Sequence, residues 1–235
     1  MRDARDARER LIVALDVSSA AAAQKIVAAV GDSARYYKVG LQLYTAEGPH
    51  IVRDLVASGR QVFLDLKFHD IPNTVGAAVR EAAKLGVSML TVHTAGGGTM
   101  LRAAVDSARN SIASPMILGV TVLTSLDSRD LEHAGVRGSV VDQVSRLAAL
   151  AISSGCHGVV ASAQEAAALR AELGDDFLIV TPGVRPPGSG HGDQARVVTP
   201  AEAIAAGASL VVVGRPITEA SDPGAEAREI LAQLA

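Results

Sequence analysis

The alternation of strand-like and helix-like segments constrains the fold of this chain more than any other feature. From Leu11 onward, short runs rich in β-branched residues alternate with Ala-rich, helix-favouring segments, and the pair recurs eight times. The strands are expected at 11–17, 35–39, 61–67, 88–93, 116–122, 157–161, 177–181 and 209–213. The helices are expected at 20–30, 49–57, 73–85, 98–110, 140–154, 164–173, 200–206 and 223–234.

This alternation predicts an α/β protein of the (β/α)₈ TIM-barrel class. Regular βα units call for a parallel sheet, and eight of them in 235 residues is the usual size of such a barrel. The alternative is an open doubly wound sheet, but the first expected strand ends in Asp16-Val-Ser rather than a Gly-x-Gly-x-x-Gly turn. We therefore expect a single domain over residues 1–235, with 1–10 as a charged N-terminal extension.

Charge and cysteine content argue against several classes of protein. The chain has 22 basic and 25 acidic residues and a formal net charge of −3, which offers no large positive field for a nucleic acid. A single cysteine, Cys156, allows no internal disulfide. No apolar run reaches membrane-spanning length, and the charged start lacks the hydrophobic stretch of a signal peptide. We expect a cytoplasmic protein with neither nucleic acid nor membrane as a partner.

Three ionisable residues gather at the end of the third expected strand. Asp65 and Lys67 lie two residues apart, so in a regular strand their side chains point to the same side. Asp70 follows just beyond the strand, where Ile71-Pro72 ends it and Asn73-Thr74 begins the next helix. A structural ion pair is one explanation for this cluster, and a catalytic site is the other.

The C-terminal strand ends of a TIM barrel form its active face, and many polar residues are expected there. Glycine and arginine follow the seventh strand, in Thr181-Pro-Gly-Val-Arg185, and the eighth, in Val213-Gly-Arg215, which suits a phosphate group. The Gly-rich segment 186–195 between them suggests a lid with Gln194 in reach of that phosphate, although tight turns and a surface loop would give the same pattern. The full set at this face comprises Asp16, Lys38, Asp65, Lys67, Asp70, His93, Thr121, Thr124, Arg185 and Arg215.

The residue pattern favours lysine acid–base or electrostatic chemistry on a phosphorylated small molecule. The six histidines show no metal-binding spacing, and a lysine beside the strand-three carboxylates opposes a metal ion. No signature of a nucleophilic serine or cysteine is present. We expect no metal site, and we expect His93 to be a structural residue at its strand end.

Several motifs together resemble those of the orotidine 5′-phosphate decarboxylase family. They are Leu15-Asp-Val17, Tyr37-Lys-Val-Gly40, Asp65-Leu-Lys-Phe-His-Asp-Ile-Pro-Asn-Thr74, Val122-Leu-Thr-Ser125, Thr181-Pro-Gly-Val-Arg185, Gly192-Asp-Gln194 and Val213-Gly-Arg-Pro216. The resemblance covers nearly the whole chain and implies conversion of orotidine 5′-monophosphate to UMP and CO₂ in de novo pyrimidine biosynthesis. The shorter core Asp-x-Lys-x-x-Asp is shared with metal-dependent sugar-phosphate decarboxylases and aldol-type synthases, which are the alternative.

The resemblance also implies roles for individual residues and requires no cofactor. Lys67 would be the proton donor to C6, and Asp65 the carboxylate beside the scissile group. Asp16 and Lys38 would contact the ribose and the active site, and Thr124 would lie near the pyrimidine. Arg185, Gln194, Gly214 and Arg215 would bind the phosphate. A homodimer is implied, in which one subunit contributes to its neighbour's site the segment Asp70, Ile71, Pro72, Asn73 and Thr74.

Overall fold

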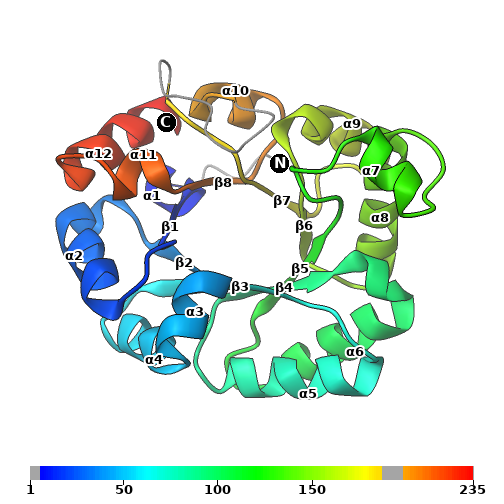
Figure 1. The fold of residues 1–235 in the computed structure, drawn as a ribbon, viewed down its shortest axis with the longest axis horizontal. Helices are drawn as coiled ribbons and strands as arrows, with labels where there is room; N and C mark the ends of the chain where they lie inside the picture. Colours follow the sequence, from blue (N-terminus) through cyan, green and yellow to red (C-terminus); the bar gives the residue numbers. More distant parts are fainter. Residues whose placement is uncertain (1–5, 187–197, 235) are drawn as a thin grey trace.

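The protein is a closed barrel of parallel strands surrounded by helices (Figure 1). The computed structural model describes residues 6–186 and 198–234, and within them the strands follow one another around the barrel in sequence order, with β8 pairing to β1. The predicted TIM barrel is therefore confirmed. In the described part of the chain, no helix is both long and apolar enough to cross a membrane.

Every expected strand overlaps an observed one. The strands are β1 (Leu11–Ala14), β2 (Tyr36–Gly40), β3 (Gln61–Phe68), β4 (Met89–His93), β5 (Met116–Val120), β6 (Gly158–Val160), β7 (Leu178–Thr181) and β8 (Leu210–Val213). β1 ends three residues earlier than expected and β5 two residues earlier. At both places the chain leaves the sheet at the barrel mouth, so that the residues that follow line the mouth rather than continue the strand.

The helices that cover the strands also match the expectation. They are α2 (Ala20–Val30), α4 (His50–Ala57), α5 (Pro72–Ala83), α6 (Gly97–Arg109), α8 (Val140–Ser153), α9 (Ala163–Leu173), α10 (Pro200–Ala205) and α12 (Pro223–Leu234). Side-chain caps mark several of their starts: Ser19 accepts a hydrogen bond from the N–H of Ala22, and Ser139 and Asp142 form a capping box. Pro72 is the first residue of α5, a position whose N–H has no partner within the helix, so the N–H that proline lacks is not needed there.

Among the described residues, four short helices were not predicted. They are α1 (Ala7–Arg10), α3 (Leu41–Glu47), α7 (Ser128–His133) and α11 (Arg215–Thr218), with two 3₁₀ turns at Gly31–Ser33 and Thr94–Gly96. Helix α1 lies within the segment 1–10 that was expected to be an extension, and it packs against α12 and β1. Helices of this length show too few turns to produce a recognisable apolar period and depend on tertiary contacts for stability.

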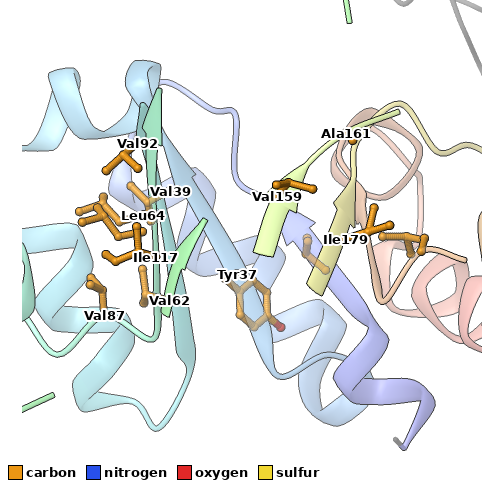
Figure 2. Packing of buried hydrophobic residues seen from close by; sticks show 14 of the residues in the cluster. Tyr37, Val39, Val62, Leu64, Val87, Val92, Ile117, Val159, Ala161 and Ile179 are labelled. Carbon is orange, nitrogen blue, oxygen red and sulfur yellow. The ribbon is translucent and has the colours of Figure 1, made fainter. Parts of the chain in front are cut away.

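The apolar core has two layers, separated by the barrel wall. Alternate strand residues point inward, and the inner layer comprises Ile12, Ala14, Phe63, Met89, Leu118, Val180, Leu210 and Val212. The residues between them point outward beneath the helices, as Figure 2 shows for Val39, Leu64 and Val92 on one side of the barrel and Val159 and Ile179 on the other. Apolar side chains fill the interior of the barrel, and the charged side chains lie at its mouth, at the C-terminal ends of the strands.

Candidate active site

The mouth of the barrel holds a cavity of about 570 Å³ at the C-terminal ends of the strands. This size suits a small-molecule ligand. Apolar residues form part of its wall, including Phe63, Val120, Val160 and Val212. The predicted site residues that line it are Asp16, Lys38, Asp65, Lys67, Thr124, Arg185, Gly214 and Arg215.

A chain of alternating charges runs along the cavity wall from β1 to β3. The Lys38 Nζ lies 2.7 Å from Asp16 Oδ1 and 3.9 Å from Asp65 Oδ2. The Lys67 Nζ donates to both carboxylate oxygens of Asp65, each at 2.9 Å. Since the side chains of Lys38 and Asp65 are only 11% and 14% exposed, the pairing of opposite charges is what makes their burial tolerable.

Gly40 leaves the space that this chain of charges occupies. It lies at the end of β2, opposite Asp65 in the sheet. A Cβ atom at this position would lie 2.9 Å from Lys38 Nζ and 3.1 Å from Asp16 Oδ1. The backbone of Gly40 is extended, with φ −100°, so its small size rather than its flexibility is what the site uses.

Lys67 reaches Asp65 through an irregular strand rather than a regular one. The register of β3 shifts between Leu64 and Phe68, and Lys67 has a left-handed backbone with φ 51°. Such a conformation costs a residue with a side chain about 1–2 kcal/mol. The prediction that the two side chains meet is confirmed by their distance, but simple strand alternation was the wrong reason for it.

Two arginines meet at the β7 and β8 side of the cavity. Arg185 is buried and Arg215 is exposed. Burial lowers the pKa of Arg185, the positive charge of Arg215 lowers it further, and Glu219 acts in the opposite direction. Two guanidinium groups close enough to affect each other form a site where an anion would be stabilised.

The backbone between these arginines and their strands also suits an anion. Gly183, two residues before Arg185, has φ 74°, a conformation that glycine adopts without strain. Gly214 lies between β8 and Arg215, and both line the cavity. The phosphate site expected at this end of the cavity stays a prediction.

Comparison with known proteins identifies the family. A model described as "Orotidine 5'-phosphate decarboxylase / HUMPS family" matches residues 9–230. The chain belongs to this family. It is 52% identical to orotidine 5′-phosphate decarboxylase from Moorella thermoacetica, over 97% of this chain and 93% of that protein, and 52% identical to the one from Anaeromyxobacter dehalogenans, over 96% and 98%. The crystal structure of orotidine 5′-phosphate decarboxylase from Lactobacillus acidophilus matches with a TM-score of 0.86 and 39% identity, over 96% of this chain and 99% of that one.

The family's strand-three motif divides into two parts in this structure. Asp65 and Lys67 line the cavity, whereas the segment from Asp70 to Thr74 does not. Asp70 accepts a hydrogen bond from the N–H of Ile71, and Ile71 is 67% exposed. Within the described part of the chain, the second negative charge beside the lysines comes from Asp16 rather than Asp70. The expected role of residues 70–74 in a neighbouring site stays a prediction, and Gln194 lies outside the described residues.

His93, the last residue of β4, lies beside this motif. Its ring stacks on that of His69, with centroids 5.1 Å apart. Among the described residues, its buried Nδ1 has no hydrogen-bond partner. Burial lowers the pKa of His93, and the neighbouring His69 and Lys67 lower it further. These features favour a neutral imidazole.

Sequence reasoning missed several residues of the site. Gln42 lines the cavity two residues after β2, and its place close to a strand end was the signal that could have found it. Glu219 also lines the cavity, but it follows α11 rather than a strand. Thr91 is buried in β4 and bonds to both Asp65 and Lys67, and nothing local in the sequence reveals it. In the described ranges, no group of three or more His, Cys, Asp or Glu residues is placed to hold a metal ion.

Proposed function

We propose that this protein decarboxylates orotidine 5′-monophosphate to UMP and CO₂. The observation that carries the proposal is that one cavity holds the Asp16–Lys38–Asp65–Lys67 chain of charges and, at its β7 and β8 side, the arginine pair. The relatives named orotidine 5′-phosphate decarboxylase at about half identity over nearly the full chain support the same activity. With it, the protein would act in de novo pyrimidine biosynthesis in the cytoplasm.

In this proposal the arginines hold the phosphate of the nucleotide. Arg185 and Arg215 would donate charge-assisted hydrogen bonds, joined by the backbone at Gly214 and by Gln194. Asp16 and Lys38 would contact the ribose, and Thr124 the pyrimidine. The lining of the cavity by these residues, Gln194 apart, supports the assignment.

Lys67 would act on the carbon that loses CO₂. When the bond between C6 and the carboxylate breaks, the electron pair stays on C6, and this carbanion has little resonance stabilisation. The Lys67 ammonium would stabilise the developing negative charge and then give its proton to C6. The two hydrogen bonds to Asp65 hold the ammonium in place, and Lys38 balances the charge of Asp65 from the other side. The reaction written this way needs neither a metal nor a cofactor.

We further propose a homodimer in which the segment from Asp70 to Thr74 enters the partner's site. Asp70, Ile71, Asn73 and Thr74 are exposed in the single chain, and the segment lies outside its own cavity. In such a dimer the partner subunit would cover Ile71, which is 67% exposed in the single chain.

Ultraviolet absorbance of orotidine 5′-monophosphate, followed with the purified protein, tests the activity. The wild type should consume the substrate, and Lys67→Ala should lose nearly all turnover while binding UMP. Lys84→Ala is the matched control, because Lys84 is an exposed lysine paired with Glu81 far from the cavity. Near-normal turnover by Lys67→Ala would refute the role of this lysine.

The same assay with a chelator separates the proposal from a metal-dependent sugar-phosphate enzyme on this barrel. Turnover of orotidine 5′-monophosphate should be unchanged in excess EDTA. Loss of turnover on chelation, restored by Mg²⁺, would favour the alternative.

A further inference from the structure

The irregularity in β3 places a single residue of β4 opposite three residues of the active-site strand. Leu64 pairs with Leu90, and the next pair is Phe68 with Val92. Asp65, Leu66 and Lys67 therefore lie opposite Thr91 alone. A strand with extra residues leaves backbone groups without their sheet partners, and another group must satisfy them.

The side chain of Thr91 satisfies one of these backbone groups, the N–H of Lys67. Its Oγ1 accepts a hydrogen bond from the backbone N–H of Lys67 at 2.9 Å, and it lies 3.0 Å from Asp65 Oδ1. Thr91 is fully buried, with an exposed fraction of 0%, so water does not compete for these bonds.

The direction of both bonds follows from the chemistry of the groups. An amide N–H only donates, so the hydroxyl oxygen accepts from Lys67, and the hydroxyl proton is left for the carboxylate of Asp65. One hydroxyl thus fixes the backbone of Lys67 in its left-handed conformation and, at the same time, the carboxylate that holds the Lys67 ammonium. The Thr91 Oγ1 therefore contacts the backbone of Lys67 directly and its ammonium indirectly, through Asp65.

We propose that Thr91 is a positioning residue that holds Lys67 and Asp65 in their reactive arrangement. Thr91 is not among the residues that line the cavity, so its effect passes through these two neighbours. The inference rests on the proposed decarboxylation, since it concerns the same lysine. It predicts an effect on the chemical step rather than on substrate binding, because the arginines proposed to hold the phosphate follow other strands, β7 and β8.

The test compares Thr91→Val with Thr91→Ser. Valine keeps the shape of threonine but has no hydroxyl, whereas serine keeps the hydroxyl and loses only a methyl group. Thr94→Val is the matched control: Thr94 is equally buried, lies three residues away, and its Oγ1 has no hydrogen-bond partner among the described residues. If Thr91→Val does not fold, Thr91→Ala removes the hydroxyl without adding a methyl group.

The kinetics should separate the variants. We expect Thr91→Val to lower kcat about 10- to 100-fold, with KM for orotidine 5′-monophosphate and the affinity for UMP within about threefold of wild type. Thr91→Ser and Thr94→Val should keep kcat within about threefold. A wild-type kcat in Thr91→Val, an equal loss in Thr91→Ser, or a change confined to KM would overturn the inference.

Crystal structures of the variants test the inference independently of activity. If the wild type does not turn over orotidine 5′-monophosphate, the proposed function is refuted, but the structures still show whether Thr91 positions Lys67 and Asp65. In Thr91→Val, we expect Lys67 to leave its left-handed conformation or Asp65 to lose its contact with the Lys67 ammonium. In Thr91→Ser, both should be retained. An unchanged arrangement of Lys67 and Asp65 in Thr91→Val would show that the hydroxyl does not position them.

Discussion

Replacing Gly40 by alanine should lower activity without lowering stability. The added Cβ would lie 2.9 Å from Lys38 Nζ, and ordinary contact begins about 0.5 Å farther out. The backbone of Gly40 has φ −100° and ψ −172°, which alanine adopts without strain. The end of the Lys38 side chain must therefore move, and its bond to Asp16, at 2.7 Å, changes with it.

The size of the effect follows from this displacement. A misplacement of about 1 Å in an active site costs about 100-fold in rate, so a shift of about half that distance should lower kcat about tenfold, or about 1.4 kcal/mol. The free energy of unfolding should stay within about 1 kcal/mol of wild type, because a flexible side-chain end absorbs the contact and alanine reduces the entropy of the unfolded chain.

The assay pairs decarboxylation kinetics with urea unfolding. Gly98→Ala is the control: in α6 the new Cβ would lie 3.0 Å from Nη1 of Arg102, also the end of a flexible side chain, but far from the ion-pair chain. Gly98→Ala should keep the wild-type kcat. If Gly40→Ala also keeps it, the position of the Lys38 ammonium does not limit the reaction. If Gly40→Ala instead loses more than about 2 kcal/mol of stability, the backbone has absorbed the contact and the reasoning is wrong.

Three further predictions follow from the site. Arg215→Ala should raise KM and also lower kcat in steady-state kinetics, because binding energy at the phosphate is used to assemble the site; a change in KM alone would show that the arginine only tethers the substrate. Lys67→Ala and Asp70→Ala should each be inactive as homodimers, but mixing equal amounts under subunit exchange should restore about a quarter of wild-type activity; no recovery despite verified exchange would place Asp70 in its own subunit's site. Urea midpoints should fall as the pH drops below 6.5, the ordinary pKa of histidine, because burial lowers the pKa of His93 and the folded chain then binds fewer protons than the unfolded chain. Burial also lowers the pKa of His157, so His93→Phe should reduce this dependence without abolishing it, and the same change at the exposed His50 should leave it unchanged.

The order and number of the strands could be predicted from the sequence. Strand and helix periods are local properties, so β8 was expected at 209–213 and lies at Leu210–Val213, and α12 has the expected bounds. The polar residues at the strand ends followed from the fold, since all parallel strands end at the same face. For this reason the sequence alone places Asp16, Lys38 and the two arginines at the face where the cavity lies.

The partners of those residues were decided only by the tertiary structure. Which carboxylate meets Lys38 depends on the register between neighbouring strands, and the pairing of β1 with β2 brings Asp16 beside it. The shift in β3 is likewise invisible locally, because Asp65 and Lys67 show the spacing of a regular strand. Thr91 acquires its role from that shift: its hydroxyl meets a free N–H and a carboxylate only because the opposite strand carries extra residues at that point.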